Sequence, residues 1–199
     1  MANHIYQFKV TLLNVEPSVW RRILVPDNYS FWDLHVAIQD SMGWTDSHLH
    51  LFRMRRKHSR KIIEIGIPND EAFDDEPDIL PGWDTMVSEY FYDLGNKAEY
   101  LYDFGDSWLH EILLEGHLLK KTSLKYPLCL DGSRACPPED CGGESGYFHL
   151  LEVISNPHHE EHEEMLEWIG KPFNPSEFDP KQVKFDNPKK RWKNAFAKE

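Results

Sequence analysis

The sequence has little cysteine and no long apolar run. An odd number of cysteines, three in 199 residues, cannot form a closed disulfide framework, so we expect reduced thiols and a cytoplasmic protein. No stretch approaches the roughly 18 apolar residues of a membrane-spanning helix, and no early segment has the pattern of a signal peptide. We therefore expect no membrane partner.

Basic residues are also scarce, with 22 Lys and Arg against 34 Asp and Glu and a net charge of −12. Because phosphate binding relies on Lys and Arg, nucleic acid is not the favoured partner. One local exception is a basic segment (RMRRKHSRK) that would form a phosphate or nucleic-acid patch from Arg53, Arg55, Arg56 and Arg60. The simpler interpretation is a solvated strand end facing the acidic stretch 62–96.

What the sequence does have is 40% apolar and 13% aromatic residues, enough for a sizeable core. Alternating, β-former-rich patterns predict strands at 4–13, 19–25, 48–54, 62–67, 98–102 and 108–114. The best-marked helix starts after Ser30, which has Asp33 in the capping-box position, and ends before Gly43. This order predicts an α+β fold with a β-grasp-like (ubiquitin-like) mixed sheet and one main helix.

The amino-acid composition changes after residue 120. Eight of the 13 prolines lie from Pro127 onward, all three cysteines lie in this part, and helical patterns appear at 147–154 and 157–169. We expect residues 1–120 to form the β-grasp-like core. Residues 121–199 would form an irregular, Cys- and Pro-containing α-helical lobe packed on it, within a single structural domain.

The sharpest local motif is the segment LCLDGSRACPPEDCGGESGY. Three thiolates and one imidazole would complete a tetrahedral zinc shell, so we predict a zinc site from Cys129, Cys136, Cys141 and His162. The imidazoles at 149, 158 and 159 are alternative fourth ligands. Two other interpretations stay open, a redox pair of Cys136 and Cys141, or buried thiols in a rigid loop.

A second set of polar residues surrounds the segment YDFGDSWLH. We predict that Asp103, Asp106 and His110, together with His48 or His50, form an acid–base or metal site. The simpler interpretation is an Asp-Gly hairpin turn beside ordinary core histidines.

The segment 158–162 (HHEEH) also matches the inverted metallopeptidase pattern His-x-x-Glu-His. On a helix, that pattern would place two imidazoles on one face beside a glutamate base. Chance matches are frequent in so His- and Glu-rich a segment, so the match carries little weight.

Several blocks together resemble a known family. They are PSVWRR, MGW followed by HLHLF, YDFGDSW, CPPEDCGG, HEEHE and the final EW preceding FNP. The chain is similar to the plasmid pRiA-type ORF-three-like family, whose members are also described as insertion-element passenger proteins of the TnpR (resolvase) type. The resemblance covers nearly the whole chain and implies no established activity.

Recombinase chemistry does not fit these residues. Ser18 is followed by Arg21 and Arg22, but all three lie in a predicted hairpin, and no tyrosine follows Tyr147. The basic run 189–193 lacks a partner helix for a helix-turn-helix. A looser association with mobile elements stays open.

We expect a non-enzymatic binding or adaptor module for a protein or peptide partner, with sheet edges or the Cys-rich loop as its docking surface. Whether the protein is an enzyme stays open. The alternative is a metal-dependent hydrolase or nucleic-acid-processing enzyme associated with mobile elements. That alternative requires the predicted Asp and His side chains to face one cleft. Zinc is the only cofactor that the sequence indicates.

Overall fold

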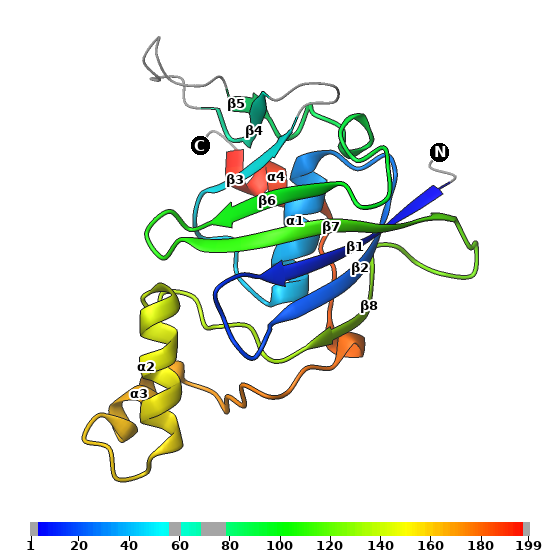
Figure 1. The fold of residues 1–199 in the computed structure, drawn as a ribbon. Coiled ribbons are helices and arrows are strands. Elements are labelled where there is room, and N and C mark those ends of the chain that lie inside the picture. The colour runs from blue at the N-terminus through cyan, green and yellow to red at the C-terminus, as the bar shows by residue number, and fades with distance from the viewer. Residues whose placement is uncertain (1–3, 56–60, 69–78, 197–199) are drawn as a thin grey trace.

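The computed structural model describes residues 4–55, 61–68 and 79–196. Within them the chain forms a sheet of eight strands with helices on one face and beyond one end (Figure 1). The strands are β1 (His4–Leu12), β2 (Trp20–Pro26), β3 (His50–Arg55), β4 (Ile62–Gly66), β5 (Ile79–Pro81), β6 (Lys97–Tyr102), β7 (Trp108–Leu119) and β8 (Leu128–Ser133). The helices are α1 (Phe31–Met42), α2 (Gly143–Ser155), α3 (His162–Ile169) and α4 (Pro188–Phe196), with 3-10 turns η1 (Val87–Glu89) and η2 (Pro180–Gln182).

The strands run in the order β5-β4-β3-β6-β7-β1-β2-β8. All neighbours are antiparallel except β4 and β5, so the sheet is mixed and the predicted α+β class is confirmed. The predicted hairpin of β1 and β2 followed by α1 is present. The narrower β-grasp assignment stays a prediction.

Local sequence signals define α1. The Ser30 hydroxyl accepts a hydrogen bond from the Asp33 backbone N–H, and the Asp33 carboxylate accepts one from the Ser30 N–H, which forms the predicted capping box. Gly43 ends the helix at φ 90°, a left-handed conformation that glycine adopts without steric cost.

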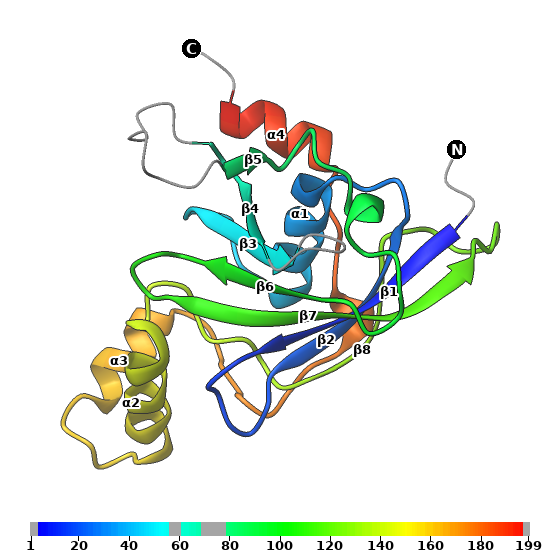
Figure 2. The ribbon, with the colours of Figure 1, turned by 45° about the horizontal axis from the view of Figure 1, so that its top comes forward.

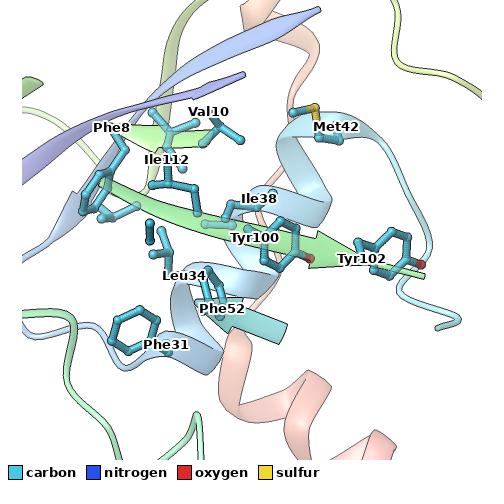
Figure 3. Close-up of a cluster of buried hydrophobic side chains, with 14 of the residues drawn as sticks. Phe8, Val10, Phe31, Leu34, Ile38, Met42, Phe52, Tyr100, Tyr102 and Ile112 are labelled. Carbon is cyan, nitrogen blue, oxygen red and sulfur yellow. The ribbon is translucent and has the colours of Figure 1, made fainter. Parts of the chain in front are cut away.

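The core lies between α1 and the sheet. Leu34 and Ile38 of α1 are fully buried and lie close to the rings of Phe52 and Tyr100 from β3 and β6 (Figure 3). Each fully buried aliphatic side chain contributes about 1.5–3 kcal/mol relative to its exposed state. The strict alternation of β6 and β7 places their buried residues toward α1 and leaves the charged ones, such as Lys97 and Glu111, on the solvated face.

The sequence patterns missed β5, β8 and α4. Strand β8 pairs with β2, so a segment after residue 120 forms one edge of the sheet. Helix α4 packs on α1, where the indole N–H of Trp32 donates to the carbonyl of Pro188 at 3.0 Å (Figure 2). Helices α2 and α3 stand beyond the end of the sheet near the β6–β7 turn. No helix in the described ranges has the length and apolarity needed to cross a membrane.

Candidate functional site

The loop that follows β8 and carries the Cys-Pro-Pro-Glu-Asp-Cys motif is tied down on the core. The indole N–H of Trp44 donates to the carbonyl of Pro137 at 2.9 Å. The Glu139 carboxylate accepts hydrogen bonds from the Thr45 backbone N–H at 2.8 Å and from the Tyr102 hydroxyl. These contacts fix the loop against the segment after α1 and the end of β6.

The turn between β6 and β7 has the predicted Asp-Gly conformation. Asp103 has φ 57°, and its Oδ1 accepts hydrogen bonds from the backbone N–H groups of Gly105 and Asp106 at 2.9 and 3.3 Å. The Asp106 carboxylate in turn accepts from the Gly142 N–H at 3.2 Å. The turn and the Cys-containing loop therefore hold each other in place.

Three chemically active side chains meet where the loop and the turn join. The His48 Nε2 atom lies 3.0 Å from Oδ1 of Asp140 and 3.6 Å from Oδ2 of Asp103. The three ligand atoms all lie within 4.8 Å of one another. The sequence predicted His48 and Asp103 but missed Asp140, because nothing in the local pattern shows where an irregular loop folds back.

The other candidate residues lie elsewhere, so of the predicted set of Asp103, Asp106 and His110 with His48 or His50, the structure brings together Asp103 and His48. His50 is buried on the core face of β3, stacked on the His35 ring at 3.5 Å between centroids, and burial lowers the pKa of both imidazoles well below 6.5. His110 is fully buried inside the sheet–helix core, where desolvation lowers its pKa to about 4. Asp106 binds the loop backbone instead. The hydrolase arrangement therefore lacks the convergence that it requires.

The four predicted zinc ligands do not converge either. Within the described residues, two clusters of three His, Cys, Asp or Glu ligand atoms lie mutually within 4.8 Å, and neither contains a cysteine. His162 instead has its Nδ1 2.9 Å from the carbonyl of Val153. Burial raises the pKa of Cys129 to about 11, that of Cys141 to about 12, and that of Cys136 further still. All three thiols are free, with Cys129 buried and Cys136 and Cys141 half-buried. The buried-thiol interpretation stays a prediction.

The inverted metallopeptidase pattern is not on a helix. Helix α3 begins only at His162, and residues 158–161 form the preceding turn. The imidazoles at 158 and 162 therefore do not share the helical face that this chemistry requires.

The predicted basic patch is only partly described. The Arg53 guanidinium is paired with Glu64, with 2.7 Å between Nε and Oε1, while Arg55 is exposed at the end of β3. Arg56 and Arg60 lie outside the described residues. The phosphate patch stays a prediction, with one of its four arginines already neutralised.

Two hollows share Asp140 and Trp168 in their linings, and we call them together the loop cleft. The larger, about 870 Å³, runs between the end of α1, the Cys-containing loop and the return segment 168–184. The smaller, about 230 Å³, lies between that loop, α2 and α3. Trp168 is 47% exposed although its indole is large and apolar, and it borders both hollows.

The rim of the loop cleft is acidic. Leaving aside Asp40, which is paired with Arg191, six exposed or half-buried carboxylates line it, against the exposed Lys171 and Lys184 and the buried Arg21. The six carboxylates belong to Glu139, Asp140, Glu161, Glu164, Glu177 and Asp179. The cleft thus combines an exposed aromatic ring with an excess of negative charge.

The chain is similar to known proteins along most of its length. It is 37% identical over 199 residues to the uncharacterized protein y4hQ of Sinorhizobium fredii (strain NBRC 101917 / NGR234), covering 100% of this chain and 95% of that protein. A crystal structure of a protein of unknown function, MM3350 from Methanosarcina mazei Go1, superposes with a TM-score of 0.85 at 41% identity, covering 93% of this chain and 100% of the other. The family model for the plasmid pRiA4b ORF-3-like protein matches residues 4–182. The chain therefore belongs to the plasmid pRiA4b ORF-3-like family.

Proposed function

We propose that this protein is a non-enzymatic binding module whose loop cleft receives an extended, Lys- or Arg-containing peptide segment of a partner protein. The observation that carries the proposal is the half-exposed Trp168 at the junction of two hollows whose rims are acidic. A few hot-spot residues supply most of the binding energy in protein interfaces, and tryptophan is enriched among them. A tryptophan face surrounded by carboxylates attracts a guanidinium or ammonium group by both cation–π and ionic contacts.

The charge of the whole chain favours the same class of partner. A net charge of −12 repels acidic ligands and accelerates encounter with basic ones. Glu177 and Asp179 are exposed on the return segment, so their carboxylates are accessible to a partner. Asp40 also borders the larger hollow, but its carboxylate is paired with Arg191 at 2.6 Å and is left out of the count.

Binding in the cleft is favoured over strand addition at a sheet edge. At one edge, β8 is covered by the return segment, where the Ala135 N–H donates to the carbonyl of Pro175 and the Phe178 ring lies against Gly132. At the other edge, β5 is only three residues long. Short or covered edges are poor templates for an added strand.

The test is fluorescence anisotropy with labelled peptide pools of equal length. One pool pairs Lys or Arg with apolar residues, and the other replaces each Lys and Arg with Gln. We expect binding of the basic pool only, and a loss of about thirtyfold in affinity for Trp168→Ala, the lower end for truncating an interface hot spot. Helix α3 has no buried residue, so this change leaves the fold intact.

The matched control for the tryptophan is Leu94→Ala, which removes an exposed apolar side chain outside the cleft. A charge series compares Glu177→Gln and Glu164→Gln with Glu89→Gln, an exposed carboxylate on η1. The first two variants should weaken binding and flatten its salt dependence, and the third should do neither. Equal binding of both pools, or equal effects of the cleft and control variants, would refute the proposal.

A further inference from the structure

We propose that His48, Asp103 and Asp140 bind a divalent transition-metal ion. The inference does not rest on the peptide cleft, because His48 and Asp103 do not line it and Asp140 is the one residue that the two sites share. It rests on where three ligand atoms lie and on how the surrounding hydrogen bonds leave them free. The predicted zinc site based on cysteine is thereby replaced by one built from imidazole and carboxylate.

The spacing of the three ligand atoms suits one shared ion. An ion bonded at about 2.1 Å to each ligand sets neighbouring ligand atoms about 3.0–3.4 Å apart. The observed separations from His48 Nε2 are 3.0 Å to Asp140 and 3.6 Å to Asp103. The Asp103 and Asp140 ligand atoms also lie within 4.8 Å of each other, so small side-chain rotations can bring all three onto one ion.

The bonding around Asp103 supplies an independent sign of a ligand. Its side chain is 10% exposed, and its Oδ1 already accepts two backbone hydrogen bonds. The other oxygen, Oδ2, accepts no hydrogen bond from the described residues and points toward His48. The negative charge of a carboxylate on a side chain this deeply buried is costly unless a cation compensates it.

The imidazole of His48 gives the same indication. Its Nε2 atom is shielded from solvent and makes no hydrogen bond of acceptable geometry in the described part of the chain, although two carboxylates lie near it. A neutral imidazole can instead direct the Nε2 lone pair at an ion between those carboxylates.

The donor set indicates the class of metal. One imidazole and two carboxylates suit Zn²⁺, Mn²⁺ or Fe²⁺ better than Ca²⁺ or Mg²⁺, which prefer all-oxygen sites. Three protein ligands leave coordination positions open for water. Asp140 is 67% exposed, so the ion can enter and exchange from the solvent side.

The experiment is a titration of untagged, chelator-stripped protein with Co²⁺ and Zn²⁺, followed by optical absorption and calorimetry. We expect one ion per chain, weak visible Co²⁺ bands, and no intense near-ultraviolet band of a thiolate–Co²⁺ bond. Asp103→Asn and Asp140→Asn should each weaken affinity at least about tenfold, since even changes outside the first shell cost that much. Both replacements keep the side-chain shape, and asparagine tolerates the positive φ of 57° and 60° at these positions.

Two controls make the result specific. Cys141→Ser should leave Co²⁺ affinity unchanged, because it alters the neighbouring thiol only. His117→Ala, which breaks the other three-residue ligand cluster (His4, Asp27 and His117), should also leave it unchanged. No uptake by the wild type, uptake that survives both Asn variants, or a thiolate band that disappears in Cys141→Ser would overturn the proposal.

Discussion

The imidazole of His35 is stacked on that of His50, with ring centroids 3.5 Å apart and ring planes 9° from parallel. Both rings are buried between α1 and β3, beneath Trp32. The His35 Nδ1 lies 2.8 Å from the Tyr100 hydroxyl, and its Nε2 lies 2.6 Å from Asp46. If both imidazoles of the stacked pair were charged, they would repel each other directly. Burial disfavours the charged form of even one of them.

The first prediction concerns acid stability. The pKa of His35 and of His50 is lowered by burial in the folded state, so below pH 6.5 the unfolded chain binds protons that the native chain does not. Stability is therefore complete above pH 6.5 and is lost as the pH falls below it, by about 1.4 kcal/mol per histidine per pH unit. Urea unfolding at pH 7.5 and 5.5, in chelator, measures this loss.

Variants separate these histidines from other titrating groups. His50→Phe keeps an aromatic ring in the stack and removes one titration, so the stability difference between pH 7.5 and 5.5 should shrink by about 1.4 kcal/mol. His149→Gln, at a half-exposed imidazole outside the core, is the control for replacing a histidine. Asp46, whose pKa is raised by burial, acts with the opposite sign, because its native carboxylate takes up a proton at a higher pH than the unfolded one. Identical pH dependence in the wild type and His50→Phe would contradict the assignment.

The elements with local signals were the ones that the sequence predicted well. The capping residues Ser30 and Asp33, the terminal Gly43, and the alternation of β6 and β7 each act through neighbours a few residues away. The Asp103 turn is of the same kind, since its hydrogen bonds go to residues two and three positions on. Short-range geometry of this type can be inferred from one sequence.

The sequence patterns did not predict features that depend on residues far away in the sequence. Strand β8 has an Asp-Gly pair in its sequence and is a strand because β2 offers a pairing edge. Helix α4 is strongly basic, and its position depends on Arg191 reaching Asp40. The residue type alone does not separate His48, His50 and His110. The fold places His50 and His110 in the core and His48 at the candidate site.

The second prediction tests the contact that holds α4 on α1. One Nη of Arg191 lies 2.6 Å from Asp40, and the other lies 3.7 Å from Asp46, and these carboxylates are 6% and 10% exposed. Arg191→Met leaves both carboxylates buried without their cation and should cost about 3 kcal/mol of unfolding free energy, the lower end for a broken buried pair. Lys193→Met removes an exposed charge from the same helix and should cost less than about 0.5 kcal/mol. Equal losses of unfolding free energy in the two variants would show that the charge of α4, rather than the Arg191 contact, determines stability.

The third prediction concerns the thiols. Because burial raises the pKa of all three cysteines, the reactive thiolate is almost absent near pH 8. Native protein should react with a disulfide reagent at least about a hundredfold more slowly than free cysteine, and three thiols should appear on denaturation. Rapid native reaction, or a diamide-induced disulfide that is lost in Cys141→Ser, would instead support the redox pair of Cys136 and Cys141.

The last prediction tests whether backbone packing positions Asp140. A Cβ added at Gly146, in the first turn of α2, would lie 1.8 Å from the carbonyl oxygen of Cys141, which cannot move without shifting the backbone next to Asp140. Gly146→Ala should therefore weaken Co²⁺ affinity by about tenfold or more, comparable to disturbing the groups that orient a ligand, and cost about 1–3 kcal/mol of stability through overpacking. The adjacent Ser145→Ala changes an exposed residue of the same turn and should do neither. If Gly146→Ala lost stability yet bound Co²⁺ as the wild type does, the ion would not depend on where this loop places Asp140, and the ligand set would need revision.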